Sequence, residues 1–163
     1  MNSILSILLL IFTLSGFLGC GNDTPVKEEQ PQIKTIPKAS VFRGINFGMP
    51  INQVKRRESA VLIDEDEENM VLSYTLDLNE VEFADIRYTF LEGRLDKIEY
   101  DVYTQSKESA TDFYQKFEKE FNDFYEGEEN IWDGTIKNKR FTVFLKQINV
   151  GNNHGVVVVW EVL

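Results

Sequence analysis

The sequence contains very few of the side chains that carry most enzyme chemistry. Its 163 residues include one cysteine, Cys20, and one histidine, His154. A lone cysteine excludes an intrachain disulfide, and the chain has no cysteine and histidine cluster with the spacing of a zinc site. A glycine-rich phosphate-binding loop and a zincin motif are also absent from the sequence. We therefore predict a protein that is not an enzyme.

His154 is the one residue that could suggest a catalyst. It lies in residues 149–155, NVGNNHG, a segment rich in turn-forming residues. The sequence shows no nucleophile and no orienting partner beside it, as a general base would need. We expect a turn residue between two strands. The alternative is an unrecognised hydrolase that depends on His154 or on one of the many carboxylates.

Proline is scarce as well, and its placement divides the chain. Three of the four prolines lie in the polar residues 21–40, and none follows Pro50. Proline lacks the N–H that a strand ladder needs, so residues 20–40 are predicted to be a tether; an added N-terminal strand is the alternative. Such a tether spans ~25 Å as a coil and ~60 Å when extended. Residues 41–163 suffice for a single domain.

The sequence has one long hydrophobic run, from Ile4 to Leu18, and Cys20 follows it after a single glycine. It barely reaches the ~20 apolar residues of a membrane span. The sequence FLGC at residues 17–20 resembles the lipobox of bacterial lipoproteins. This resemblance implies a signal peptide over residues 1–19 and a diacylglycerol on Cys20, whose new amino terminus is acylated. Two lipid chains anchor stably, so the lipid bilayer is an expected partner. A secretory signal and an uncleaved anchor are the alternatives.

The residues after Cys20 bear on location. In proteobacterial lipoproteins, Asp after the lipidated Cys favours retention in the inner membrane, and Gly21 stands there in this chain. The resemblance therefore implies the bacterial cell envelope, at the outer membrane of a two-membrane cell, facing the periplasm. Lys27-Glu28-Glu29 resembles the export tags of surface lipoproteins, so surface exposure is the alternative.

Acidic residues outnumber basic ones, 27 to 17, which gives a net charge of −10. Such a chain repels nucleic acid, which we do not expect as a partner. The strongest acidic run predicts a solvated, exposed loop; the alternatives are a contact for a basic protein and a Ca²⁺ site, although the spacing is not that of an EF-hand. It consists of Asp64, Glu65, Asp66, Glu67 and Glu68. A second acidic loop holds Glu126, Glu128, Glu129 and Asp133. Apart from lipid on Cys20, no cofactor is predicted.

The pattern of apolar residues predicts a short helix and then three strands. Pro50 suits the first position of the helix, which would bury Val54 and expose the basic residues 55–57. Residues 70–78 and 84–90 alternate between apolar and polar, as half-buried strands do. Glu92-Gly93 predicts a tight hairpin turn into a strand over residues 95–102. The uneven step from Leu95 to Ile98 predicts a bulge.

A longer helix follows. Ser106 is its expected cap and Gly127 its expected end. Its apolar side is almost entirely aromatic: Ala110, Phe113, Tyr114, Phe117, Phe121, Phe124 and Tyr125. We interpret this stripe as core packing, with a ligand groove as the alternative. Strands are predicted over residues 140–148 and 156–162, and a short one at 131–132. The run VVVVW at 156–160 predicts a strand buried on both faces.

The predicted fold class is α+β, a mostly antiparallel sheet packed against two helices in the order helix, strands, helix, strands. Phe47-Gly48-Met49-Pro50, followed by Val54, resembles the strand-to-helix opening of small envelope lipoproteins similar to the outer-membrane-assembly accessory family and the β-lactamase inhibitory proteins. This resemblance implies a domain that binds another envelope protein across its sheet. It carries over no binding residue, because nothing outside this opening aligns.

The sequence thus predicts a membrane-anchored envelope lipoprotein that acts as a non-catalytic protein-binding module. Its partner would be another envelope or secreted protein. This function has two versions. In the first, the protein is an accessory to envelope assembly. In the second, it is an inhibitor or immunity-type protein that binds a basic protein. The alternative is a carrier that holds a small apolar ligand or lipid between the aromatic helix and the sheet.

Overall fold

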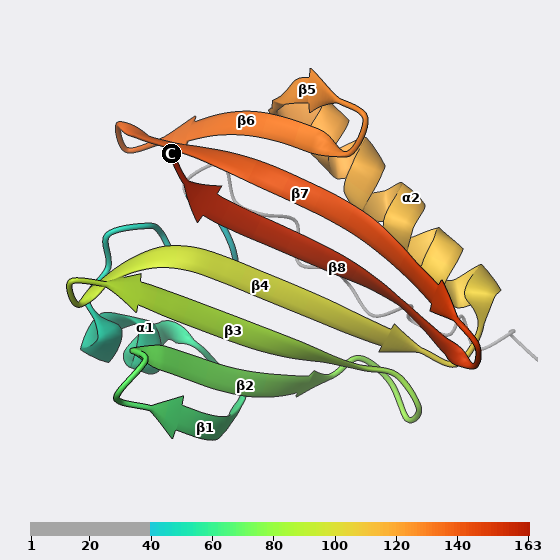
Figure 1. Ribbon diagram of the computed structural model, residues 1–163, viewed down its shortest axis with the longest axis horizontal. Coiled ribbons are helices and arrows are strands. Elements are labelled where there is room, and N and C mark those ends of the chain that lie inside the picture. Colours follow the sequence, from blue (N-terminus) through green and yellow to red (C-terminus); the bar gives the residue numbers. More distant parts are fainter. Residues whose placement is uncertain (1–39) are drawn as a thin grey trace, which may run out of the picture.

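Eight strands form one antiparallel sheet, with both helices on the same side of it (Figure 1). The computed structural model describes residues 40–163, and the predicted signal peptide, Cys20 and the tether up to residue 39 lie outside them. The first half contains α1 (Ile51–Arg57), β1 (Val61–Asp66), β2 (Val71–Asp77), β3 (Phe83–Leu91) and β4 (Arg94–Thr104). The second half contains α2 (Lys107–Phe124), β5 (Glu126–Glu128), β6 (Ile131–Ile136), β7 (Lys139–Val150) and β8 (Asn153–Val162).

The strand order is β1-β2-β3-β4-β8-β7-β6-β5, and every neighbouring pair is antiparallel. Each half is a four-stranded meander, and the halves join where β4 pairs with β8. The predicted α+β class with a mostly antiparallel sheet is confirmed. One helix precedes the strands and the other lies between them. The second half has four strands, where the sequence indicated two or three.

The predicted central strands of the first half are confirmed. β2 and β3 bury their even-numbered side chains, as the alternation indicated. Glu92 and Gly93 form the expected hairpin turn, with φ of +51° and +72°; glycine adopts such angles readily. Leu95 pairs with Phe90 and Lys97 with Thr89, so that Asp96 is the extra residue of the expected bulge.

Both helices begin close to their predicted starts. In α1, Pro50 occupies the cap position and Val54 is fully buried. In α2, the Ser106 Oγ accepts a hydrogen bond of 3.1 Å from the Ser109 amide, which satisfies one unpaired N–H of the first turn. The predicted end of α2 at Gly127 is wrong.

The α2 helix ends at Phe124, because Tyr125 is already extended. The Tyr125 ring packs edge-on against Phe141 at 5.5 Å, and Glu126 then pairs with Asp133 across β5 and β6. Tertiary packing and strand pairing therefore stop the helix before its glycine, which lies in β5.

The aromatic stripe of α2 packs on the sheet, as core residues do, except for Phe124, which is 42% exposed. The Phe121 ring lies 5.2 Å from Trp132 and 5.9 Å from Trp160, while Phe117 lies 6.0 Å from Tyr100. Residues 41–49 add to this core, because Phe42 packs against Trp160 at 5.0 Å. Burying an aromatic or aliphatic side chain contributes about 1.5–3 kcal/mol, so this face carries most of the stability.

Two expectations for the strands are wrong. β8 is not buried on both faces: Val156, Val158 and Trp160 are buried, but Val157 and Val159 are partly exposed on the side away from the helices. The acidic run is not a simple loop either, since Asp64, Glu65 and Asp66 lie in the edge strand β1. Unpaired edges favour association, and charged side chains discourage it. Pairing with β2 makes this acidic segment a strand, and its charges discourage association at the free edge.

Candidate functional site

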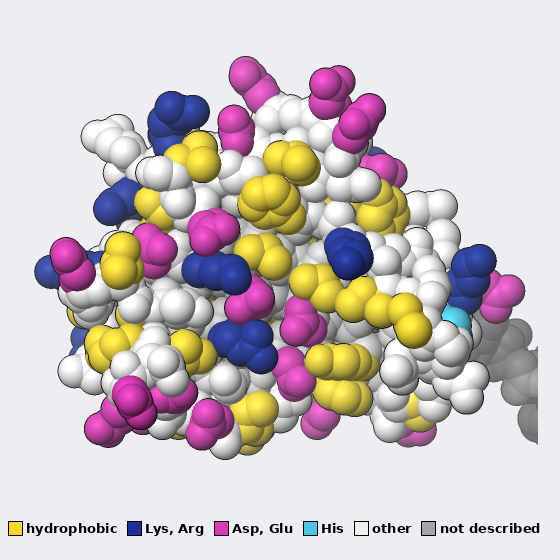
Figure 2. Space-filling model, viewed as in Figure 1, with side chains coloured by type: hydrophobic (Ala, Val, Ile, Leu, Met, Phe, Trp, Pro, Cys, Tyr) yellow, Lys and Arg dark blue, Asp and Glu magenta, His cyan; other side chains and the backbone are white. Residues whose placement is uncertain are grey.

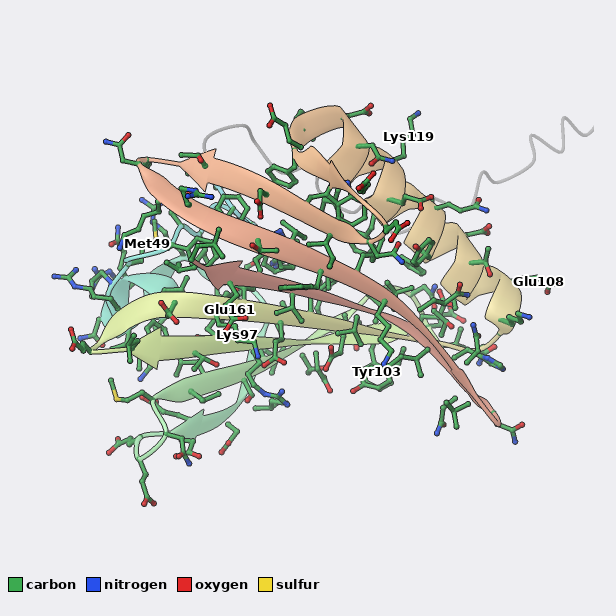
Figure 3. All side chains as sticks on the ribbon, turned by 45° about the horizontal axis from the view of Figure 1, so that its top comes forward. Met49, Lys97, Tyr103, Glu108, Lys119 and Glu161 are labelled. Carbon is green, nitrogen blue, oxygen red and sulfur yellow. The ribbon has the colours of Figure 1, made fainter. Side chains whose placement is uncertain are left out.

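The side of the sheet opposite the helices is uncovered in the described part of the chain, and we call it the open face. It carries the alternate side chains of every strand, because successive residues point to opposite faces. Figure 2 shows this face, with hydrophobic side chains gathered in patches over the middle strands among acidic and basic ones. Lys97, Tyr103 and Glu161 lie on it, whereas Glu108 and Lys119 belong to α2 behind the sheet (Figure 3).

Apolar side chains cross the open face from β3 to β6 in what we call the apolar band. The strand register places its members on adjacent strands: Phe83 opposite Tyr103, Val159 opposite Phe144, and Phe144 opposite Ile131. Val157 lies between these groups on β8. Between 39% and 48% of Phe83, Tyr103, Phe144 and Ile131 is exposed. A band of this length on one face is typical of a protein-binding surface.

Charged side chains lie beside the apolar band. On β3, β4 and β8 the open face carries the acids Asp85, Glu99, Asp101 and Glu161 and the bases Arg87 and Lys97. Both bases approach the same acid, because Arg87 Nη1 and Lys97 Nζ each lie 3.4 Å from a Glu99 carboxylate oxygen. Asp85 and Asp101 are direct cross-strand neighbours. The ion pairs among the described residues include neither of them.

One end of the open face is hollowed into a pocket of about 540 Å³. Phe83 and Tyr103 lie on one side of it, with their rings stacked at 4.7 Å and inclined by 20°. Ile148 and the turn at Asn152 lie on the other side, and Asp101 and Val157 lie toward the middle of the sheet. A volume of this size is typical of sites that hold a small ligand or a group of side chains.

Gly155 is the floor of this pocket and lies between Tyr103 and Ile148 in the register. A Cβ at this position would lie 2.2 Å from the Val102 carbonyl oxygen. Glycine is therefore required here, because β4 approaches β8 too closely for any side chain.

Asp101 is the carboxylate that lines the pocket. Burial raises its pKa, and the nearby charges of Glu99 and Asp85 add to this effect, while Arg87 and Lys97 oppose it. The ionised form of Asp101 is thus held in an environment that disfavours it. Raised pKa values of this kind occur often at functional sites.

His154 lies at the rim of the pocket, but in strand β8 and not in the turn that the sequence indicated. Its Nδ1 is 3.0 Å from Asn149 Oδ1. The Thr104 hydroxyl, the nearest candidate nucleophile along the lining, donates its hydrogen bond to the Ser106 carbonyl at 3.0 Å. The pocket shows no nucleophile paired with this base.

The five residues of the predicted acidic contact are divided between β1 and the turn that follows it. Glu65 forms an ion pair with Lys55 of α1, and Asp66 accepts hydrogen bonds from the amide and side chain of Asn69, which lower its pKa. Asp64, Glu67 and Glu68 are exposed. These three form none of the ion pairs among the described residues, while Glu65 is exposed but paired.

The other charged segments keep local roles. Glu126 and Glu128 lie in the edge strand β5, and Glu129 lies in the turn that follows. Asp133 accepts a hydrogen bond of 2.9 Å from Thr142.

Across residues 40–163, no group of three or more acidic, histidine or cysteine side chains is placed to hold a metal ion. None of the helices in this range is long and apolar enough to span a bilayer.

A buried ionic network, which the sequence did not reveal, fixes α1 to the sheet. The Glu58 side chain is fully buried and pairs with Arg43 at 2.9 Å. It also accepts hydrogen bonds from the Tyr88 hydroxyl at 2.5 Å and the Ala60 amide at 2.8 Å. Burial alone would raise the pKa of Glu58, but these bonds outweigh it and hold the pKa below its usual value. Every partner is satisfied, which is typical of a structural role.

Phe83, Tyr103 and Asp101 were not singled out in the sequence. The sequence does contain a signal for the aromatic pair, because the outward positions of β3 and β4 are mostly polar and Phe83 and Tyr103 are aromatic exceptions.

Comparison of the chain with models of protein families, with curated proteins and with solved structures finds no match. The site must therefore be interpreted from its own geometry.

Proposed function

We propose that the protein is a membrane-tethered envelope domain that binds another protein on its open face and catalyses nothing. The observation that carries this proposal is the apolar band, an uncovered row of hydrophobic side chains across the middle of the open face with charged side chains beside it. Interfaces combine such an apolar centre with a polar rim. The acids on β3, β4 and β8, together with the net charge of −10, favour a basic partner.

The alternative function, a carrier of a lipid or another apolar ligand between α2 and the sheet, has less support. Phe113, Phe117 and Phe121 are at most 4% exposed, and aromatic partners contact Phe117 and Phe121 from the sheet side. A ligand there would have to displace these contacts, each of which adds stability.

The membrane tether is part of the proposal and has its own test. The FLGC sequence at residues 17–20 supports cleavage before Cys20, lipidation of Cys20 and location at the periplasmic side of the outer membrane, with surface display as the alternative. Mass spectrometry of the mature amino-terminal peptide should show a diacylglycerol and an acyl chain on Cys20. A full-length Cys20→Ser variant should carry no lipid and should keep residues 1–19. An unmodified Cys20 in membrane-bound protein would contradict the anchor.

The binding function is tested by mild cross-linking in the native membrane, followed by purification of the full chain and mass spectrometry. We expect one protein partner in stoichiometric amount. Phe144→Glu and Ile131→Glu place a charge in the apolar band at positions that are 39% and 48% exposed, so both variants should fold but lose the partner. Gln115→Glu adds the same charge to the exposed surface of α2 and should retain it. Purification of a lipid or metabolite without any protein would instead support the carrier.

A further inference from the structure

We propose that the pocket beside the Phe83–Tyr103 stack receives a basic side chain of the partner, foremost an arginine. This inference rests on the proposed function and names the chemistry that the open face recognises. It is carried by three features that meet in one hollow: an aromatic platform, a carboxylate without an ion-pair partner, and a floor that has no side chain.

The aromatic platform suits a cation. Phe83 is 41% and Tyr103 43% exposed, and their stacked rings form one side of the pocket. The face of an aromatic ring attracts Lys and, more often, Arg, because its electron density is negative. The guanidinium of arginine is planar and loses little hydration when it stacks on a ring. Pure apolar packing would bury these rings more completely than the described residues do.

The carboxylates supply the opposite charge. Asp101 lines the pocket, and Asp85 lies directly opposite it on β3. Like charges in opposite cross-strand positions destabilise a sheet. The two nearby bases, Arg87 and Lys97, both bind Glu99 and offset the charge of Asp101 only in part, because its pKa remains raised. Lys146 lies beyond Val157, one strand further away. A guanidinium over Tyr103 would lie next to Asp101 and supply the missing positive charge.

The shape favours a side chain that enters from outside the sheet. Gly155 leaves the floor open between Tyr103 and Ile148, and the volume of about 540 Å³ exceeds what one planar guanidinium needs. The rim is polar, with Asn152, Asn153 and His154, so the neighbouring backbone of a partner finds hydrogen-bond groups there. A bare metal ion is a poorer occupant, because no group of three ligating side chains occurs among residues 40–163.

The test uses the isotope-labelled full chain in detergent micelles and two small probes. N-acetyl-arginine amide should shift the amide resonances of Tyr103, Gly155 and Val157 in a saturable way. The citrulline analogue has the same shape without the charge and should shift them at least tenfold less. Asp101→Asn and Tyr103→Leu should each weaken arginine binding about tenfold. Asp112→Asn removes one charge from the exposed side of α2 and should leave binding unchanged.

The same variants are then compared in the native-membrane cross-linking experiment. Loss of the partner with Asp101→Asn and Tyr103→Leu, but not with Asp112→Asn, supports the inference. A partner captured equally by all variants overturns it and leaves the protein-binding function intact. Arginine binding without any captured protein would instead assign the pocket to a small cationic ligand and overturn both. No shift with the arginine probe overturns the pocket assignment, and resonance dispersion confirms that each variant is folded.

Discussion

Asp101 shows how a single residue can oppose stability while it serves binding. Burial and the repulsion of Glu99 and Asp85 raise its pKa, so the folded protein holds the proton more tightly than the unfolded chain does. The free energy of unfolding therefore falls as pH rises from the ordinary value of 3.8 through the pKa of the folded state. The ionised Asp101 thus lowers the stability of the folded protein, a thermodynamic cost that is common at binding sites.

Asp101→Asn is therefore expected to stabilise the free protein at pH 7. We expect a gain of a few tenths to about 1 kcal/mol, the range for like-charge cross-strand pairs, reduced by solvent screening. Urea unfolding measures this, and the gain should shrink below pH 3.8, where the wild-type carboxyl is protonated in both states. A variant that is less stable than the wild type at pH 7 would contradict the proposed environment of Asp101.

Glu58 has the opposite dependence on pH. Its hydrogen bonds to Arg43, Tyr88 and Ala60 hold the pKa below the ordinary 4.5, so its contribution is complete above pH 4.5 and is lost as pH falls through the pKa of the folded state. Removing one member of a buried pair costs about 3–5 kcal/mol. We expect Glu58→Gln to lose an amount toward the lower end, and to weaken the acid sensitivity of unfolding.

Chemical denaturation of Glu58→Gln at pH 7 and at a series of pH values down to 3 measures both effects. Glu68→Gln is the matched control, because Glu68 is exposed in the turn after β1. The account of the Glu58 network is contradicted when the two variants unfold at the same denaturant concentration.

At the scale of secondary-structure elements, the junction of β4 and β8 holds the two halves of the sheet together. Gly155 permits their close approach, since a Cβ there would lie 2.2 Å from the Val102 carbonyl oxygen. Gly155→Ala must push β4 away from β8. We expect a loss of more than about 2 kcal/mol, comparable with overpacking a core.

Thermal unfolding of Gly155→Ala, compared with that of Ser73→Ala on β2, measures this cost. Ser73 is a partly buried strand residue on the open face, so its substitution keeps the backbone unchanged. A Gly155→Ala variant as stable as Ser73→Ala would mean that β4 and β8 are further apart than described.

The elements differ in how well the sequence predicted them, and the reasons are physical. β2, β3 and the Glu92-Gly93 turn follow from local alternation and turn chemistry, which act within a few residues. β1 was missed because its acidic residues have low strand propensity, and only pairing with β2 makes it a strand. The end of α2 was misplaced because the packing of Tyr125 on Phe141, far along the chain, decides it.

The candidate site was harder to predict than the fold. VVVVW at residues 156–160 is apolar at every position, and the sequence alone cannot tell a strand buried on both faces from one whose second face is left for a partner. The pocket depends on the register that places Phe83, Tyr103 and Gly155 side by side. Such long-range register is not encoded in any local motif.

At the scale of the whole molecule, the negative charge should govern how fast a basic partner associates. Opposite charges steer encounter, and salt screens them over a Debye length of ~8 Å at physiological ionic strength. We expect the association rate, measured by surface plasmon resonance with the partner, to fall as salt rises from 0.05 to 0.5 M, while dissociation changes little. Over this range the Debye length shortens from roughly 14 Å to about 4 Å.

Charge reversal identifies which acids contribute. Asp64, Glu67 and Glu68 are exposed and replaceable by Lys without loss of an internal partner, whereas Glu65 and Asp66 bind Lys55 and Asn69. The triple variant should slow association several-fold. Reversal of Glu108, Asp112 and Asp123 on the exposed side of α2, behind the sheet, is the matched control. Unchanged association with the first variant would remove the acidic run from the recognition surface.

The central claim, that the open face binds a protein, is tested most directly by a site-specific photo-cross-linker. Phe144 is 39% exposed in the apolar band, so the additional benzoyl group of p-benzoyl-phenylalanine can extend from this position toward a partner. Lys119 on the outer side of α2 is the control position (Figure 3). In the native membrane, we predict one discrete protein adduct from position 144 and none from position 119. The account is contradicted when position 144 gives no protein adduct, or when both positions give the same one.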